Sequence, residues 1–265
     1  MLKNGWLTAF AWLVYIFLYA PIIVLVIFSF DDSRLGVTWT GFTIKWYQSL
    51  FSDRNIIDAL INSLTIASSA VVISTVMGVL AAVGLAEIKS KNAEMVFRGL
   101  LILPVLVPEI AMAVSALILF IAIGFQLGLT SVIAAHVVFC LSYVCLTVSA
   151  RLEGMNPHLK EAALDLGLTP VKTFFKVTLP LLAPGIISGA LLAFVLSLDD
   201  FVITQFTAGV GATTLPLRIY SMVKFGVSPE INALSTLMLL ATVLIAGLAE
   251  LIRYRSDNAI SKSTT

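Results

Sequence analysis

One charged stretch of this chain decides how the rest of it is interpreted. It runs Glu161-Ala162-Ala163-Leu164-Asp165-Leu166-Gly167 and continues to Val177-Thr178-Leu179-Pro180. The stretch lies between two long apolar segments, in a part of the chain that is rich in Lys and Arg. Because basic residues collect in the cytoplasmic loops of membrane proteins, we expect this loop to face the cytoplasm, where a soluble partner holds it.

The composition is that of a membrane protein. Of the 265 residues, 59% are hydrophobic and 12% are charged, and the mean hydropathy is +1.03. A soluble domain averages about 45–50% apolar and about 25% charged residues, so this chain has too little polar surface to fold in water. The net charge of +1 provides no field that would attract nucleic acid. Cys140 and Cys145 lie in an apolar run, which favours buried free thiols over a metal site or a disulfide.

Six apolar segments are long enough to cross a bilayer, which takes about 20 residues in a helix. They cover roughly residues 7–29, 59–86, 99–123, 128–150, 183–206 and 232–252. The first segment is longer than the apolar region of a signal peptide and lacks a small-residue cleavage site, so we interpret it as an uncleaved signal anchor. The sequence therefore predicts an all-α polytopic membrane protein, with one transmembrane domain over residues 1–255 and a tail over 256–265.

The basic residues also predict the orientation. Loops on one side of the six spans carry 11 Lys and Arg residues, and loops on the other side carry 5. Since the richer side is cytoplasmic, we expect both termini in the cytoplasm and the segments 30–58 and 207–231 outside. The segment 30–58 is rich in Trp, Tyr and Phe, which favour the membrane–water interface. It is either a helix that lies on the outer leaflet or a lid or docking surface for an extracytoplasmic partner.

The cytoplasmic loop 151–182 contains the signals of two short helices. Asn156 before Pro157 is typical of a helix start, and Gly167 is typical of a helix end. Thr169 before Pro170 repeats the start signal, and the second helix is expected to stop before Pro180.

The first of these helices carries a surface suited to close contact. Glu161 and Asp165 are four residues apart and share one face. Ala162 and Ala163 keep the neighbouring surface small, which lets a partner approach closely. By spacing alone, an amphipathic connector that rests on the lipid headgroups is an equal alternative.

The loop resembles the signature loop of ABC importer permeases. The family pattern is Glu-Ala-Ala, three residues, Gly, nine residues, an aliphatic residue, one residue and Leu-Pro. Its seven positions here are Glu161, Ala162, Ala163, Gly167, Val177, Leu179 and Pro180, and the family usually has Ile where Val177 stands. The resemblance implies the type I importer permease fold, similar to the methionine-importer permease. It also implies contact with a cytoplasmic ATPase through Glu161, Ala162, Ala163, Asp165, Gly167 and Leu168.

A second resemblance covers nearly the whole chain. Residues 197–204, 215–224 and 226–234, with Tyr19-Ala20-Pro21 and Trp46-Tyr47, are similar to the spermidine/putrescine importer permeases. The similarity is to the second permease of such systems, which works beside a different first one. Related iron, thiamine and opine permeases share the signature loop and are the alternative.

This resemblance implies a bacterial inner-membrane location and a set of partners. They are a second, different permease subunit, two copies of a cytoplasmic ATPase, a periplasmic substrate-binding protein and the polyamine. The chain itself is expected to hold no cofactor, because ATP and Mg²⁺ belong to the ATPase, and to make no contact with nucleic acid.

Three carboxylates lie within or near the ends of apolar segments, where burying a charge in the membrane is energetically costly. They are Glu109, Asp199 and Asp200. Glu109 follows Pro104 and Pro108, a spacing that opens or kinks a membrane helix. An intramembrane carboxylate is costly unless it faces a cavity or a counter-charge. We therefore expect these acids to form part of a path for a cationic substrate.

Aromatic rings would supply faces for charged amines along such a path. The candidates are Trp46, Tyr47, Phe201 and Tyr220. The alternative for the two aspartates is structural, in that they cap a helix end or pair with Arg218.

Two stripes of residues have two interpretations each. A polar stripe on the fourth span either lines the pathway or forms interhelical hydrogen bonds; it consists of His136, Cys140, Tyr143 and Thr147. A small-residue stripe on the second span indicates close helix packing, either within the chain or against a second permease; it consists of Ala70, Ser74, Gly78, Ala82 and Ala86.

Three classes of function compete: a permease subunit of an ATP-driven importer, a stand-alone secondary transporter and an intramembrane enzyme. The sequence has no P-loop, so another chain must bind ATP. Six spans suit half of a pore better than a complete secondary transporter, which often carries two repeats. No His-Glu-x-x-His or Gly-x-Ser-x-Gly pattern supports an enzyme. We therefore expect a non-catalytic permease subunit.

Overall fold

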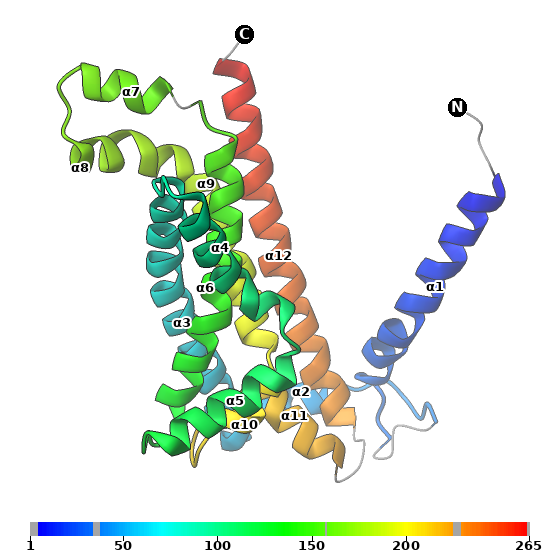
Figure 1. Ribbon diagram of the computed structural model, residues 1–265. Helices are drawn as coiled ribbons and strands as arrows, with labels where there is room; N and C mark the ends of the chain where they lie inside the picture. Colours follow the sequence, from blue (N-terminus) through cyan, green and yellow to red (C-terminus); the bar gives the residue numbers. More distant parts are fainter. Residues whose placement is uncertain (1–4, 34–37, 157, 225–228, 264–265) are drawn as a thin grey trace. The chain divides into compact units, whose positions relative to one another are not determined.

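The computed structural model describes residues 5–33, 38–156, 158–224 and 229–263, with side chains over residues 6–247 of these ranges. The regular structure within these ranges is helical, apart from an isolated β-bridge between Asp31 and Phe42. This confirms the predicted all-α class. The elements are α1 (Gly5–Phe28), α2 (Lys45–Leu50), α3 (Arg54–Ala86), α4 (Lys91–Leu106), α5 (Glu109–Ala122), α6 (Leu129–Glu153), α7 (His158–Asp165), α8 (Pro170–Thr173), a π-helical turn (Phe174–Thr178), α9 (Leu179–Asp199), α10 (Val202–Thr207), α11 (Leu215–Lys224) and α12 (Pro229–Ser263) (Figure 1).

Five stretches of helix are long and apolar enough to cross a membrane. They are Trp6–Phe28, Arg54–Ala86, Leu129–Glu153, Pro170–Asp199 and Pro229–Gly247. The pair of α4 and α5 also passes this test but is bent by 106°. The described part of the chain thus contains five spans, or six if the bent pair is one span.

The bend between α4 and α5 follows from proline chemistry, as the spacing of Pro104 and Pro108 predicts. Pro108 has no N–H to continue the helical hydrogen bonds. The residue before it, Val107, is extended with ψ of 135°, the conformation that residues before proline prefer. The helix therefore ends at Leu106, and α5 starts in a new direction at Glu109 (Figure 1). The apolar segment 183–206 is likewise interrupted, between the end of α9 and the start of α10.

The chain divides into two compact units, and each is described by its own contacts. The first consists of Met1–Asp58 and Leu217–Ala241, and the second of Ala59–Pro216 and Thr242–Thr265. Within the first unit, a short aromatic-rich loop and α2 are joined by hydrogen bonds. Trp46 Nε1 donates to the carbonyl of Asp31 at 2.7 Å, and the hydroxyls of Tyr47 and Ser29 are 2.6 Å apart.

In the second unit, α6 and α9 pack closely because α9 presents a ladder of small residues to α6. The ladder repeats every four residues and is buried throughout; it consists of Gly185, Gly189, Ala193 and Ser197. A Cβ on Gly189 would lie 3.3 Å from Cα of Val144, and a Cβ on Gly185 would lie 2.8 Å from Cβ of Arg151. Small residues let two membrane helices approach to such distances. The sequence analysis does not predict this ladder, although the Gly-x-x-x-Gly spacing of Gly185 and Gly189 is a signal for it.

The small-residue stripe of α3 packs within the chain. Four of its five residues, Ala70, Ser74, Gly78 and Ala82, are buried in this isolated chain, whereas Ala86 is exposed. Gly78 faces Val144 of α6. Of the two interpretations of this stripe, the structure supports packing inside the chain.

This packing predicts the effect of enlarging Gly78. A Cβ there would lie 2.8 Å from Cγ1 of Val144, whereas a Cβ on Gly84 of the same helix would meet nothing within 4 Å. We expect Gly78→Leu to destabilise the purified protein by about 1–3 kcal/mol, the usual cost of overpacking, and Gly84→Leu to leave it close to the parent. Thermal unfolding in detergent measures both variants, and equal effects would contradict the packing described here.

Candidate functional site

The first short helix of the cytoplasmic loop, α7, ends as its sequence predicts. The Leu168 N–H donates to the carbonyl of Ala163 at 3.1 Å, and the Gly167 N–H donates to the carbonyl of Leu164 at 2.9 Å. This pair of bonds is a Schellman motif. Gly167 has φ of +83°, in the left-handed region that favours glycine. The predicted role of Gly167 in ending the helix is therefore confirmed.

Most residues expected to contact an ATPase lie on the surface of this chain. Glu161, Ala162, Asp165 and Gly167 are exposed, Leu168 is half-buried, and Ala163 is the buried residue of α7. Leu166, at the end of the same helix, is 86% exposed. The end of α7 thus presents both acidic and apolar side chains to whatever lies beside it.

The second short helix, α8, also begins as predicted. Pro170 is at its first position, and the Lys172 N–H donates to the Thr169 hydroxyl at 3.4 Å. The α-helix ends at Thr173, before Pro180 as expected, but the chain does not leave the helical path there. The chain continues through the π-helical turn, in which the Leu179 N–H donates to the Phe174 carbonyl. Pro180 is then in the first turn of α9, where a missing N–H costs no helical hydrogen bond.

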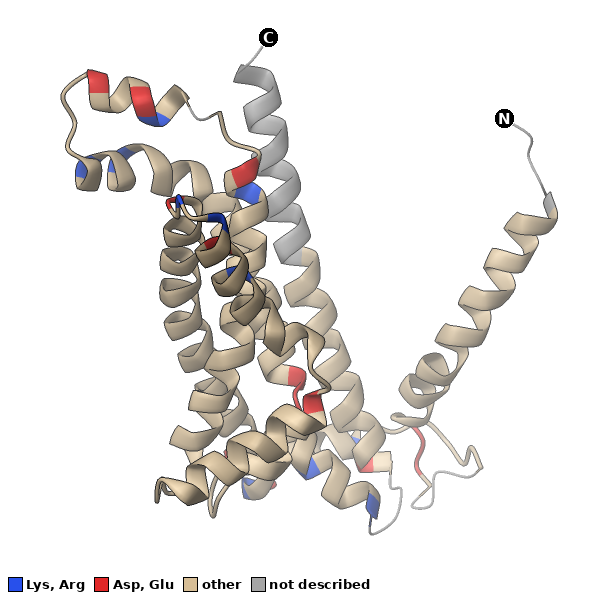
Figure 2. Cartoon of the chain, in the orientation of Figure 1, with Lys and Arg blue, Asp and Glu red and all other residues tan. Residues whose placement is uncertain are grey.

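Ion pairs connect α7 and the neighbouring helix ends of the second unit. Lys160 of α7 pairs with Glu87, which follows α3. Arg98 of α4 pairs with Glu94 at 3.3 Å and with Glu153 of α6 at 3.6 Å. Figure 2 shows charged residues around α7, α8 and the start of α4, whereas the helices of this unit are mostly uncharged between their ends. A separate group of acidic residues lies where α9 ends and α5 begins.

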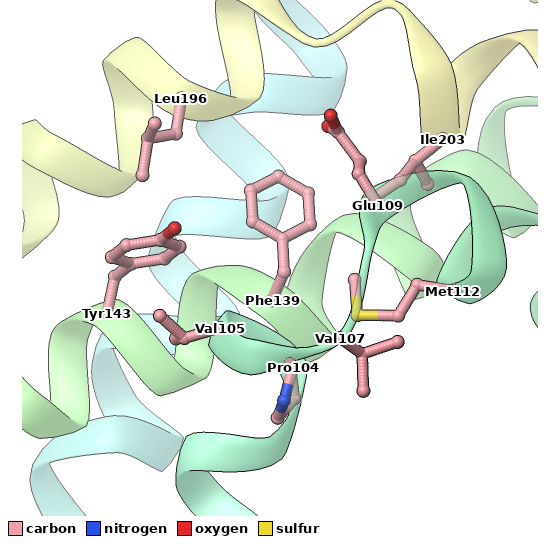
Figure 3. A pocket seen from close by; sticks show the side chains of 9 residues that line it. All are labelled: Pro104, Val105, Val107, Glu109, Met112, Phe139, Tyr143, Leu196 and Ile203. Carbon is pink, nitrogen blue, oxygen red and sulfur yellow. The ribbon is translucent and has the colours of Figure 1, made fainter.

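A cavity of about 310 Å³ lies at the bend between α4 and α5. Its lining is mostly apolar and aromatic, and consists of Pro104, Val105, Val107, Glu109, Met112, Phe139, Tyr143, Leu196 and Ile203. Figure 3 shows the Glu109 carboxyl and the Tyr143 hydroxyl on opposite sides of the Phe139 ring. The cavity thus combines one carboxyl group, one phenol and one aromatic face with apolar walls.

Asp200 lies behind this cavity, buried with 6% of its surface exposed. Its carboxylate accepts hydrogen bonds from the backbone N–H groups of Ile203 at 3.2 Å and Thr204 at 2.9 Å, and from the Thr204 hydroxyl at 2.8 Å. It thereby satisfies the first N–H groups of α10. His136 Nε2 of α6 donates to the same carboxylate at 3.1 Å. The Glu109 carboxyl is a further side-chain hydrogen-bond partner of Asp200.

Of the two structural roles considered for the aspartates, capping a helix end and pairing with Arg218, Asp200 has the first. Asp200 caps the start of α10, whereas Arg218 pairs with Asp53 at 3.6 Å. Asp199, in contrast, is exposed in this chain, and Phe201 is half-buried.

Three of the predicted path aromatics belong to the first unit. Trp46 and Tyr47 are half-buried there and use their polar atoms in the bonds described above, and Tyr220 is 52% exposed. A role of these aromatics in a substrate path stays a prediction.

The polar stripe of α6 serves two purposes. His136 and Cys140 are buried against α9: the His136 ring bonds Ser197, and the Cys140 thiol lies 3.6 Å from the carbonyl of Ala193. Tyr143 lines the cavity. Thr147 donates to the Tyr143 carbonyl within its own helix at 2.8 Å.

The fold, the bent span and the exposed two-helix loop define an importer permease, and a family comparison agrees. Residues 74–262 match the model of a family described as the binding-protein-dependent transport system inner membrane component. The chain belongs to this family.

Relatives within the family share most of this chain. The spermidine/putrescine transport system permease protein PotC of Haemophilus influenzae is 43% identical over 250 residues, which are 94% of this chain and 97% of that protein. The putrescine transport system permease protein PotI of Escherichia coli K12 is 40% identical over 263 residues, which are 97% of this chain and 94% of PotI.

Solved structures share the fold at low identity. A bacterial ABC transporter involved in the import of the acidic polysaccharide alginate superposes with a TM-score of 0.76 at 18% identity, over 96% of each chain. An inward-facing structure of the MetNI methionine ABC transporter gives a TM-score of 0.58 at 20% identity, over 80% of this chain and 99% of that one. The chain therefore has the fold of an ABC importer permease.

Proposed function

We propose that this chain forms half of the translocation pathway of an ATP-driven polyamine importer in the bacterial inner membrane. The observation that carries the proposal is its identity of 40–43%, over at least 94% of the chain, with permeases named for spermidine and putrescine transport. The cavity at the bend of α4 and α5 supports it, because its chemistry suits an alkyl amine.

A polyamine is a chain of methylene groups that carries several ammonium charges. Each charge that leaves water needs a compensating partner. In this cavity Glu109 supplies a negative charge, Phe139 and Tyr143 supply aromatic faces for an ammonium group, and Val105, Val107 and Leu196 supply an apolar wall for the methylenes. Asp199, exposed at the end of α9, would continue the path towards a second permease subunit. Phe201, Trp46, Tyr47 and Tyr220 are the further aromatic candidates.

The proposed assembly has four kinds of partner. A different permease completes the pathway, and a periplasmic binding protein delivers the polyamine. Two copies of a cytoplasmic ATPase, which hold the ATP and Mg²⁺, receive the surface formed by α7 and the turn after it. This proposal rests on the match of that loop to the family signature and on the exposure of Glu161, Asp165 and Leu166.

Uptake by whole cells tests the substrate. The chain and its partner subunits are expressed in a bacterial strain that lacks polyamine importers, and the import of radiolabelled spermidine and putrescine is measured. We expect import that excess unlabelled polyamine blocks and that thiamine, ferric iron and opines leave unchanged. Import of one of these other substrates without polyamine import would contradict the proposal.

The orientation is part of the proposed function, with both termini and α7 in the cytoplasm. In a background with Cys140 and Cys145 replaced by Ala, single cysteines are introduced at three exposed lysines. We expect Lys45→Cys and Lys224→Cys to react with a membrane-impermeant maleimide in intact cells, and Lys172→Cys to react only after the membrane is opened. Labelling of the Lys172→Cys variant in intact cells would reverse the orientation.

A further inference from the structure

The bond between His136 and Asp200 joins two parts of the second unit that are distant in sequence. Three of the hydrogen bonds to Asp200 come from Ile203 and Thr204, three and four residues after it. Another comes from His136 Nε2 of α6, 64 residues earlier in the chain. When the Asp200 carboxyl is ionised it only accepts hydrogen bonds, and Nε2 then carries the proton.

The other ring nitrogen of His136 is held as well. Its Nδ1 lies 2.7 Å from the Ser197 hydroxyl, the last member of the small-residue ladder on α9. The Ser197 hydroxyl donates to Nδ1 when the ring is neutral. His136 and Ser197 have 0% and 4% of their surface exposed. The ring is therefore fixed between the end of α9 and the start of α10, at the point where these two helices break.

This clasp of His136, Ser197, Asp200 and Thr204 lies directly behind the cavity wall. Phe139 packs beside the His136 ring, with ring centroids 5.2 Å apart, and lines the cavity. Ile203, whose backbone N–H donates to the Asp200 carboxylate, also lines the cavity. α10 packs against α5, and α5 begins with Glu109. The clasp thus holds the start of α10, which packs against α5.

We propose that His136 is a positioning residue of the substrate path: by holding Asp200 it fixes the separation between the Asp200 and Glu109 carboxyls, beside which an ammonium group of the substrate binds. This inference rests on the proposed polyamine import. His136 itself does not line the cavity and acts through Asp200. Without it, Asp200 loses its hydrogen bond to α6 and keeps those to its own segment and to Glu109.

The test compares variants of His136 in the complete transporter. His136→Leu removes both ring hydrogen bonds, whereas His136→Gln keeps an amide donor in reach of Asp200. Val148→Ala, at a fully buried position of the same helix, is the control for a general loss of α6 packing. Labelled polyamine uptake, the amount of protein in the membrane and the basal ATP hydrolysis of the assembled complex are measured for each variant.

We expect His136→Leu to reduce uptake about tenfold or more, in line with the loss of a hydrogen bond to a charged group, while membrane level and basal ATP hydrolysis persist. His136→Gln should recover most of the uptake, and Val148→Ala should keep it. In combination with Asp200→Asn, His136→Leu should add little further loss, because His136 acts through Asp200.

Two results overturn the inference while the parent imports polyamine. One is uptake at the parent rate in His136→Leu. The other is an equal loss in His136→Leu, His136→Gln and Val148→Ala, which would mean that only packing matters. A parent transporter that imports no polyamine overturns the proposed function itself, and the inference with it.

Discussion

Reversal of one charge on α7 should abolish transport without removing the protein from the membrane. Glu161 is exposed, and in the part of the chain that the structure describes its ion pair is local, with His158 at 3.0 Å, so Glu161→Lys leaves the fold of the chain intact. In the proposed complex the same change places a positive charge against the ATPase where a negative one belongs. We expect polyamine uptake to fall to background, while the chain is found in the membrane at the parent level.

Gly167→Pro should have the same effect for a different reason. Proline holds φ near about −65° and has no N–H, whereas Gly167 has φ of +83° and donates to the Leu164 carbonyl at 2.9 Å. The end of α7 must then refold.

Two conservative variants serve as controls for these substitutions. Gly167→Asn should keep most of the uptake, because asparagine tolerates the left-handed region, and Glu161→Gln should be impaired less than Glu161→Lys. Quantitative uptake with immunodetection of membrane protein measures all four. Normal uptake in both Glu161→Lys and Gly167→Pro would exclude this loop as the coupling surface.

The second large effect is expected at the cavity. Glu109→Gln keeps the size of the side chain and removes its charge. An uncompensated charge inside a membrane costs about 3 kcal/mol, and about 1.4 kcal/mol corresponds to a factor of ten. We therefore expect polyamine uptake to fall about a hundredfold, with the complex still assembled. Asp199→Asn should also lower uptake, to a smaller extent, because Asp199 is exposed at the edge of this chain.

Glu94→Gln is the matched control for the cavity acid. Glu94 is the acid of the first turn of α4, as Glu109 is of α5, but it pairs with Arg98 at an exposed helix end. Its neutralisation should leave uptake within a factor of about five, since exposed ion pairs contribute at most about 1 kcal/mol. Equal uptake by the Glu109→Gln, Asp199→Asn and parent proteins would mean that these acids are structural.

The parts of this structure that sequence alone predicts are those with local causes. Gly167 ends α7 because few other residues adopt its backbone conformation, and Thr169 with Pro170 starts α8 through a side-chain cap. The bend before Glu109 follows from the missing N–H of Pro108. Each of these features depends on residues within one or two helical turns.

The clasp behind the cavity depends on contacts across the fold, which a single sequence does not reveal. The sequence favours an interhelical partner over a pathway role for His136, but it does not show that Ser197 and Asp200 are the partners. The continuous helical path from α8 to Pro180 was not predicted, for a related reason. Proline ends a helix only when it falls beyond the first turn, and a π-helical turn placed Leu179 and Pro180 at the start of a new helix.

The central claim is that a polyamine imported at the expense of ATP passes through the cavity of this chain that Glu109 lines. Its most direct test is uptake of radiolabelled spermidine into proteoliposomes that contain the purified transporter, with its binding protein outside and ATP inside. The account predicts ATP-dependent accumulation by the parent and a loss of about a hundredfold for Glu109→Gln, with basal ATP hydrolysis retained. Accumulation at the parent rate by the Glu109→Gln transporter would contradict it.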